Sequence, residues 1–418
     1  MQQILDLHIH SKYSRACSQQ LTLSNIDAAC RVKGVDIIAT GDFTYPAWFA
    51  NIKEQLEEIG NSGLYKLKSA KDDKVKFILS TEVALIYKDP PSHGFGEASR
   101  ARRIHLMITA PNVKAAEELN KFLGSKFNIK SDGRPILGIS APALTKICLA
   151  IHPQFLIYPA HIWTPWFSVF GSKSGFDSME ECFHDQVGNI YAYETGLSSD
   201  PEMNWRLSAL DKLTLLSNSD AHSLQNIGRE ANVFELGDMT YDEIYEAIKN
   251  KDANKIKYSI EFYPEEGMYH LDGHRLCGVS FDPRETKKHK GICPSCKKPL
   301  TIGVLSRVEE LADRPSGSKP KNFPGFKKLV ELDKIIAEAL DMKSRNSKAV
   351  KKEYDNLINN IGSELEILMQ RPIEEIQKNT LPIIAEGIRR VREGELFIQP
   401  GFDGGYGEIK IFSEKEKR

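Results

Sequence analysis

Short apolar runs recur along the first 220 residues, and most of them carry or precede a side chain that binds metal ions well. These runs, predicted as strands, are residues 4–10, 35–40, 75–85, 103–109, 155–160, 189–193 and 213–217. Helix signals lie between them at residues 25–33, 113–123 and 142–151, the first capped by Ser24 and stopped by Gly34. Strands alternating with helices predict an α/β fold with a parallel sheet. Functional groups at the strand ends favour a closed (β/α) barrel over an open sheet.

The pattern changes near residue 262, where short segments punctuated by Gly and Pro replace the alternation. We therefore expect a catalytic barrel over residues 1–250, a zinc-binding segment over 262–306 and a mostly helical region over 307–418. Helices are predicted over residues 326–340, 348–370 and 381–393, followed by a short strand over 408–412. The loop 88–102 is rich in Pro, Gly and Arg, which is typical of a mobile surface loop that binds a ligand.

The composition is that of a globular protein, with 418 residues, 41% of them hydrophobic. A formal net charge of −1 gives no overall attraction to nucleic acid, so any such affinity must come from local basic patches. No run of about 18 apolar residues predicts a membrane span. The start lacks a secretion signal, and the odd number of mostly scattered cysteines indicates reduced thiols in a cytoplasmic protein.

Histidine and carboxylate pairs mark the first and last of these strands. His8 and His10 are two residues apart and share one face, as do Asp220 and His222. The candidate ligands are His8, His10, Asp42, Glu82, His105, His161, Glu194, Asp220 and His222. A single strand histidine such as His105 is more often a hydrogen-bonded core residue. Gathering nine such groups in one place is very costly without cations, and two or three divalent ions suit phosphoester hydrolysis.

These residues resemble the polymerase-and-histidinol-phosphatase (PHP) family, from the H-x-H near the start to Ser-Asp-Ala-His at residues 219–222. The resemblance implies a distorted (β/α)7 barrel with a trinuclear metal site over residues 1–235. The family's usual Thr-Asp-His appears here as Thr-Gly-Asp-Phe at residues 40–43, without the histidine. Arg15 stands where an acidic ligand is common, and its guanidinium would suit a substrate phosphate instead.

A second metal motif follows the predicted barrel. His274, Cys277, Cys293 and Cys296 form H-x2-C-x15-C-x2-C, a spacing that fits tetrahedral Zn²⁺. His270 is close enough in sequence to replace His274 as the fourth ligand. The alternative interpretation is a set of free thiols beside unrelated histidines.

Basic and aromatic residues around these motifs predict contacts with nucleic acid. Lys287, Lys288 and Lys290 lie inside the zinc motif, and Lys319 and Lys321 precede Phe323 and Phe326. Trp163 and Trp166 come just after His161 and would wall a base pocket. Each group has a plainer interpretation, a solvated surface for the lysines and core packing for the aromatic rings.

Stretches both inside and outside the predicted barrel resemble the endonuclease Q family. They include DLHIHSKYSRACS, SNSDAHS, YHLDGHRLCGV and GVLSRVEELADRP. The resemblance implies cleavage of DNA on the 5′ side of hypoxanthine, uracil, xanthine or an abasic site. It implies Zn²⁺ in the barrel cluster and the structural site, with Mg²⁺ or Mn²⁺ as candidates for activity, and DNA containing deaminated bases as the partner.

Three further expectations complete the prediction. Asp185, just before a strand, is a candidate base or a support for the metal ligands. The tail, residues 411–418, lacks the sliding-clamp peptide of some archaeal family members. The competing functions are a small-molecule phosphatase of the histidinol-phosphatase kind and a non-catalytic, metal-stabilised DNA-binding protein.

Overall fold

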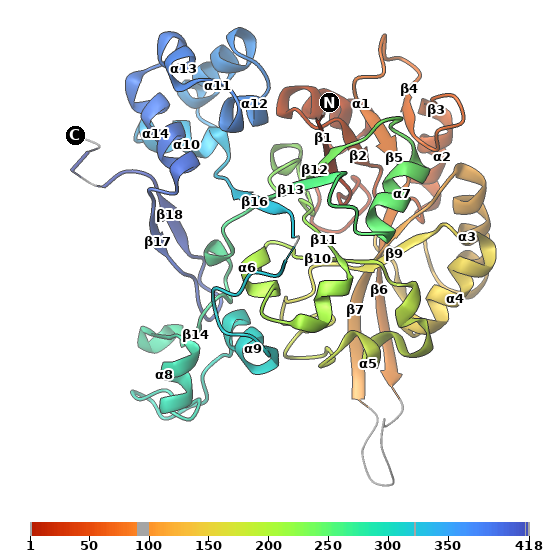
Figure 1. Ribbon diagram of the computed structural model, residues 1–418, viewed down its shortest axis with the longest axis horizontal. Coiled ribbons are helices and arrows are strands. Elements are labelled where there is room, and N and C mark those ends of the chain that lie inside the picture. Colours follow the sequence, from red (N-terminus) through yellow and green to blue (C-terminus); the bar gives the residue numbers. More distant parts are fainter. Residues whose placement is uncertain (1, 90–99, 322, 414, 417–418) are drawn as a thin grey trace.

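A computed structural model describes residues 2–89, 100–321, 323–413 and 415–416. A large mixed α/β body is joined to two smaller bodies, a lobe around the cysteine motif and a bundle of helices near the C-terminus (Figure 1). Most of the predicted loop over 88–102 lies outside the described residues. Within the described chain no helix is long and apolar enough to cross a membrane.

Three groups of strands build the large body. The eight-stranded sheet runs in the order β16 (Gly325–Lys328), β13 (Ile256–Glu261), β12 (Ala231–Glu235), β1 (Gln2–Asp6), β2 (Ile37–Ala39), β5 (Lys76–Ile78), β4 (Tyr65–Leu67) and β3 (Leu56–Glu58). A four-stranded sheet runs β8 (Ile136–Leu137), β6 (Ser80–Asp89), β7 (Arg100–Thr109) and β9 (Leu156–Pro159). The last pair is β10 (Ala192–Glu194) and β11 (Thr214–Leu216).

Backbone contacts link these groups into a ring. β5 continues into β6 across Leu79 alone. The chain after β9 joins β10, because Ile162 N donates to Glu194 O at 3.1 Å. A parallel bridge between Ile9 and Ala221 then connects the end of β11 back to β1. The predicted α/β class is therefore correct, and the strand ends face a common interior.

The predicted all-parallel sheet is wrong. β1, β2 and β5 are parallel neighbours, as are β10 and β11, but β7 pairs antiparallel with both β6 and β9. The run over 75–85, predicted as one strand, is split between β5 and β6. Only residues 90–99 separate β6 from β7, and parallel neighbours need a crossover connection of about a dozen residues or more, so a connection of this length favours antiparallel pairing.

Helices cover the outside of this ring, as Figure 1 shows. They are α1 (Leu23–Lys33), α2 (Pro46–Gln55), α3 (Val113–Lys126), α4 (Ala141–Ile151), α5 (Met179–Phe183), α6 (Pro201–Asn204) and α7 (Tyr241–Lys249). The cap of α1 is Thr22, whose side chain accepts from Asn25 N, and not the predicted Ser24. Gly34 ends this helix in the left-handed region, as expected.

The remaining chain forms the two smaller bodies. The lobe around the cysteine motif, named the zinc lobe after the metal predicted for it, contains β14 (Asp272–His274), β15 (Val279–Phe281), α8 (Pro283–Lys288) and α9 (Val304–Leu311). The bundle contains α10 (Leu332–Ala339), α11 (Lys348–Asn360), α12 (Glu364–Met369), α13 (Ile373–Asn379) and α14 (Pro382–Glu393). The ribbon of β17 (Phe397–Gln399) and β18 (Glu408–Lys410) runs between the bundle and the zinc lobe (Figure 1).

Two predicted helices are corrected here. The segment 326–340 begins as a strand, because β16 pairs with β13 at the edge of the large sheet. The segment 348–370 is two helices, α11 and α12, separated at Gly362, which has a φ of +151°. Tertiary pairing and a backbone that suits glycine override the helical pattern at these two places.

Side-chain anchors hold the smaller bodies on the large one. Arg307 of α9 donates to the carbonyl oxygens of Phe170 and Phe176, and Arg314 pairs with Asp211. On the other side Lys33 of α1 forms a buried ion pair of 2.8 Å with Glu364 of α12. The apolar core is continuous from the strands into the helical bundle.

Substitution of Gly34 tests the contact between α1 and α12. It has a φ of +89°, and a Cβ there would lie 2.4 Å from Ser363 Oγ. Gly60 has a φ of +60° and nothing within 4 Å. Alanine at either position carries the left-handed cost of about 1–2 kcal/mol. We expect Gly34→Ala to lose at least about 1 kcal/mol more than Gly60→Ala in urea unfolding, because it also displaces α12. Equal losses would contradict this contact.

Candidate functional site

Most of the predicted metal ligands follow strand ends on constrained backbone, whereas Glu82 and His105 lie within β6 and β7. His10 N donates to Ala221 O at 3.1 Å, which holds the H-x-H segment beside the D-x-H segment. Asp42, His161 and Asp220 all have positive φ angles, of 47°, 29° and 46°. Such conformations are unfavourable for residues other than glycine, and they cluster at functional sites. The fold therefore stores local strain at three of the predicted ligands.

Glu82 lies at the centre of the cluster. One of its carboxylate oxygens, Oε2, is 3.2 Å from His10 Nε2 and 3.7 Å from His8 Nε2. The other, Oε1, is 2.7 Å from His105 Nδ1 and 3.1 Å from His161 Nε2. A single buried carboxylate thus connects two groups of imidazoles. This is the arrangement expected of a carboxylate shared by two cations.

Six of the nine predicted ligands bring their ligand atoms within 4.8 Å of one another in two groups that share Glu82. They are His8, His10, Glu82 and Asp220 in one group, and Glu82, His105 and His161 in the other. His105 therefore belongs to the cluster and is not an isolated core histidine. Asp220 Oδ1 lies 3.0 Å from His10 Nε2.

The other three predicted ligands contact members of the cluster. Asp42 Oδ1 is 3.0 Å from His10 Nδ1, and Glu194 Oε2 is 3.0 Å from His8 Nδ1. These contacts turn both Nε2 atoms toward Glu82 and Asp220, as partners of metal-bound histidines do. His222 is half-buried at the rim, with its ring 4.7 Å from that of His10.

Unpartnered atoms in this cluster fit metal ions. Among the described residues His8 Nε2, His10 Nε2 and Asp220 Oδ1 are buried and make no hydrogen bond of acceptable geometry, although His10 Nε2 lies only 3.0 Å from Asp220 Oδ1. Burial raises the pKa of Glu82, yet His105 and Arg134 hold it well below its usual range. The carboxylate is therefore ionised, as a ligand must be. Buried anions and imidazoles with free ligand atoms are what a site for hard or borderline cations requires.

Arg134 belongs to this site, although no motif revealed it. Its Nη1 donates to Glu82 Oε2 at 2.9 Å. Asp132 Oδ1 accepts from the backbone N–H of Arg134 and of Arg15, which shapes the turn. At Gly133 a Cβ would lie 2.4 Å from Asp42 Oδ2, so the turn passes too close to the cluster for any side chain. The Asp-Gly-Arg sequence of the turn is the only local signal of this arrangement.

The side chains of the two predicted catalytic residues, Arg15 and Asp185, make no hydrogen bond or ion pair with the described residues of the metal cluster. Arg15 is exposed, next to this turn, and its guanidinium has no hydrogen bond to a described residue. Asp185 lies on the short 3₁₀ helix His184–Asn189, with its side chain 63% exposed and paired with Lys146 at 2.8 Å. None of the described partners of Asp185 belongs to the metal cluster, so it does not support the ligands as predicted.

The two tryptophans differ in exposure. Trp163 is 1% exposed, and its Nε1 donates to Asn204 Oδ1 at 2.8 Å. Direct contact of Trp163 with a base is therefore corrected to a packing role against Phe170, 4.9 Å away between ring centroids. Trp166 is 41% exposed and remains available to a ligand.

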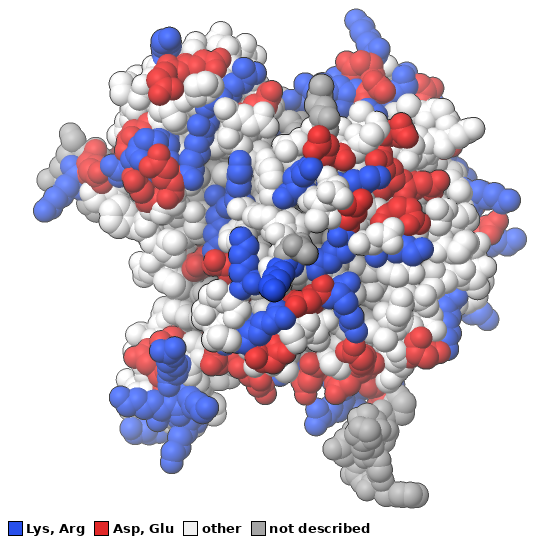
Figure 2. Space-filling view, viewed as in Figure 1, with Lys and Arg blue, Asp and Glu red and all other residues white. Residues whose placement is uncertain are grey.

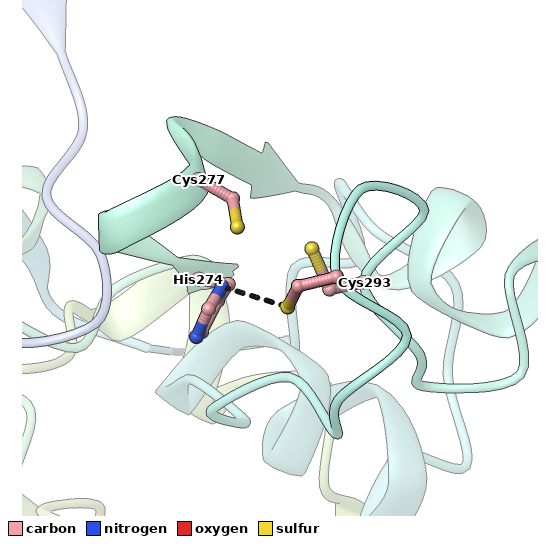
Figure 3. Close-up of side chains that lie close together, drawn as sticks. His274, Cys277 and Cys293 are labelled. Carbon is pink, nitrogen blue, oxygen red and sulfur yellow. Dashed lines mark hydrogen bonds between the residues drawn. The ribbon is translucent and has the colours of Figure 1, made fainter.

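The residues of the cysteine motif lie together and form a second candidate metal site. Ligand atoms of His274, Cys277, Cys293 and Cys296 lie within 4.8 Å of one another, and His274 Nδ1 is 3.4 Å from Cys296 Sγ (Figure 3). His270 is outside this group. Backbone N–H groups of Cys296 and Ser295 lower the pKa of the Cys293 thiol to about 6. A thiolate at neutral pH and a four-ligand set suit Zn²⁺.

The predicted DNA-binding lysines are all exposed. Lys287, Lys288 and Lys290 belong to the zinc lobe, where Figure 2 shows a dense group of Lys and Arg side chains. Lys319 and Lys321 lie before β16. Phe323 and Phe326, in contrast, both pack edge-on against Trp205, at 5.8 and 5.7 Å between ring centroids. This contact favours the packing interpretation for the two phenylalanines.

Comparisons with known proteins extend these observations. Profiles described as PHP-associated and as the MJ0043 C-terminal domain match residues 205–253 and 331–395. Uncharacterized protein MJ0043 of Methanocaldococcus jannaschii is 35% identical over 260 residues, which cover 60% of this chain and 32% of that protein. This chain thus spans less than half the length of that relative. Uncharacterized protein YqxK of Bacillus subtilis is 28% identical over 97% of this chain and 98% of that protein.

Two solved structures match nearly the whole chain. The lesion-specific endonuclease PfuEndoQ from Pyrococcus furiosus superposes with a TM-score of 0.85 and 32% identity, over 100% of this chain and 97% of that one. Endonuclease Q in complex with a 27-mer duplex substrate with an abasic lesion at the active site gives 0.84 and 33%, over 99% and 98%. The match covers the barrel, the zinc lobe and the helical bundle together.

The position of Glu82 between the two groups leads to a prediction about metal content. We expect Glu82→Ala to lose metal from both groups, because both depend on its carboxylate. His161→Ala should lose metal from its own group only. Elemental analysis after gel filtration measures this, with the zinc of the cysteine site as an internal standard. Equal metal loss in the two variants would show that Glu82 is not shared.

The cysteine site gives a separate prediction. We expect Cys293→Ser to lose one zinc per chain while the barrel metals stay, because the two sites have no ligand in common. Cys182→Ser, at a buried cysteine outside the motif, is the control and should keep its zinc. An unchanged zinc content in Cys293→Ser would exclude this site as the zinc ligand set.

Proposed function

The chain belongs to the endonuclease Q family, and we propose that it hydrolyses DNA on the 5′ side of a deaminated base or an abasic site. The deaminated bases are hypoxanthine, uracil and xanthine. The observation that carries the proposal is the shared Glu82 carboxylate, which joins two histidine groups in a chain that matches endonuclease Q along its whole length. Divalent cations, with Zn²⁺, Mg²⁺ and Mn²⁺ as candidates, are the proposed cofactors.

The protein's own residues prepare the site for phosphodiester hydrolysis. When bound, divalent cations supply hydroxide from water near neutral pH and positive charge beside the phosphoryl oxygens. His8 and His10 are held by Glu194 and Asp42, so that their Nε2 atoms are fixed before substrate arrives. This preorganisation avoids reorienting the ligands during the reaction.

Arg134 is the residue we assign to the scissile phosphate. Its guanidinium uses one N–H on Glu82 and has no other hydrogen-bond partner among the described residues, so donors remain for an anionic oxygen. The side chain is 25% exposed, which leaves it open to substrate at the edge of the cluster. Arg15, on the neighbouring segment, is the second candidate for the same phosphate or the next one.

Recognition of DNA is proposed for the exposed groups around the site. Trp166 follows the His161 segment and offers an aromatic face to an unpaired base. Lys287, Lys288, Lys290, Lys319 and Lys321 offer charge to the phosphates. A lesion that pairs weakly costs less to take out of the stack, which gives such an enzyme part of its selectivity.

A direct cleavage assay tests the proposal. Labelled duplexes carrying one deoxyinosine, one deoxyuridine or one abasic site are incubated with the protein and Mg²⁺ or Mn²⁺. We expect a nick immediately 5′ of the lesion and none in undamaged duplex. His8→Ala should abolish the nick, because it removes a central ligand, whereas Asp72→Asn, at an exposed carboxylate on the surface, should keep it.

Two results would favour the competing functions. Release of phosphate from histidinol phosphate, with damaged DNA left intact, would favour a small-molecule phosphatase. Binding of lesion DNA without turnover under every metal tried would favour a non-catalytic DNA-binding protein. A phosphatase function gives no role to the zinc lobe and its lysines. A non-catalytic function does not explain the buried ligand atoms of the cluster that make no hydrogen bond.

Substitutions of Arg134 and Arg15 distinguish the roles of these two residues. We expect Arg134→Gln to lower kcat about 100-fold, since loss of one charge-stabilising donor typically costs that much, with a smaller change in DNA affinity. Arg15→Gln, the matched variant on the exposed neighbour, should affect affinity more than kcat. Single-turnover cleavage and fluorescence anisotropy measure the two effects. The reverse pattern would assign the phosphate to Arg15.

A further inference from the structure

Two large apolar side chains extend far into solvent from the zinc lobe and the ribbon beside it. Leu276 is 90% exposed and Tyr406 is 79% exposed, the highest values for large hydrophobic residues among those described. Single exposed hydrophobic residues are common and need no explanation. These two, however, lie on segments that are joined to each other, which makes them one feature. We call this pair the apolar tip.

The apolar tip is held rigidly from both sides. Leu276 immediately precedes Cys277, a member of the cysteine site. Arg275 joins the two segments, because its backbone N–H donates to Asp403 Oδ2 at 2.6 Å and its Nη1 donates to Gly404 O at 3.1 Å. The exposed side chains are therefore presented on fixed backbone and do not belong to loosely held loops.

Close backbone contacts fix the Tyr406 side of the tip. Gly407 N donates to Glu266 O at 3.0 Å, and Gly401 N donates to Glu265 O at 2.9 Å. A Cβ at Gly407 would lie 2.0 Å from Glu265 O, so only glycine permits this approach. The turn between β17 and β18 is thus pressed against the chain that leads into the zinc lobe (Figure 1).

A chain of contacts leads from the tip to the metal cluster. Tyr269 lies beside the turn, since a Cβ at Gly404 would be 3.8 Å from its hydroxyl. The Tyr269 ring is 5.5 Å from that of Trp166, which is exposed. Thr164 Oγ1 lies 3.2 Å from His161 Nδ1 and donates to Trp166 O at 3.0 Å. The exposed Trp166 and the half-buried Tyr269 therefore connect the edge of the cluster to the segments that carry the tip.

Charge around the tip identifies the kind of partner. The zinc lobe carries exposed basic residues on α8 and on the cysteine knuckle, which form the dense blue group in Figure 2. They are Arg284, Lys287, Lys288, Lys290, Lys297 and Lys298. Positive charge in the same lobe as an exposed apolar side chain matches a polyanion with stacked apolar faces, which is the chemistry of duplex DNA.

We infer that Leu276 and Tyr406 form a wedge that inserts between stacked bases of the duplex next to the lesion. The inference rests on the proposed function and adds to it the residues that open the stack. The lysines of the zinc lobe hold the phosphates while the tip replaces base–base contacts by contacts with its own side chains. A strand without stacked, paired bases does not need this wedge.

Binding measurements on an inactive background test the wedge. His8→Ala leaves the DNA uncut, and a 2-aminopurine next to an abasic site reports loss of stacking by brighter fluorescence. We expect Leu276→Ser/Tyr406→Ala to weaken binding to the lesion duplex about tenfold or more and to remove the fluorescence rise. Binding to the same lesion in single-stranded DNA should change less than about threefold. Leu381→Ser, at an exposed leucine of the helical bundle, is the matched control and should change neither.

Several results would overturn the wedge. If the double variant binds the duplex and raises the fluorescence as the parent does, the tip has another partner. If it weakens single-stranded and duplex binding equally, the tip is a general contact and opens nothing. Zinc content and thermal unfolding of the double variant must equal those of the parent, which excludes loss of the lobe. Failure of the unsubstituted protein to bind or nick lesion DNA would instead reject the proposed function.

Discussion

The carboxylate of Glu82, shared by two groups of histidines, is the constraint on which the rest of this structure depends. It is fully buried, and its two oxygens face imidazoles from different strands and loops. Such an arrangement is costly unless cations neutralise it, and it tolerates little displacement of any strand. The ring of backbone contacts from β1 to β11, closed by Ile9 and Ala221, supplies that positional restraint.

The smaller bodies depend on the same framework. Arg307 of α9 donates to two carbonyl oxygens in the segment that follows His161, so the zinc lobe is tied directly to the edge of the metal cluster. The buried Lys33–Glu364 ion pair ties the helical bundle to α1 on another side. Groups that would hold DNA are thereby placed at fixed positions around the groups that would cut it, as an endonuclease requires.

Residues that are close in sequence were the most predictable part of the site. The pairs His8/His10 and Asp220/His222, and the Cys293/Cys296 knuckle, are recognisable because strand alternation and tight turns place their side chains together locally. Strand ends and the glycine that stops α1 were predictable for the same reason. The strand β16 was not predictable in this way. Its apolar and basic residues follow a pattern typical of a helix, and only its pairing with β13 makes this segment a strand.

The sequence by itself determined the ligand types, their order along the strands and the family they resemble, because these follow from residue identity and short spacing. Only the tertiary structure decided that Glu82 joins two histidine groups and that Arg134 contacts it from a turn some fifty residues away. It also buried Trp163 and exposed both Leu276 and Tyr406, which are 130 positions apart, on segments joined through Arg275. The reason is physical: burial and contact between distant segments depend on how the whole chain packs, which no local pattern encodes.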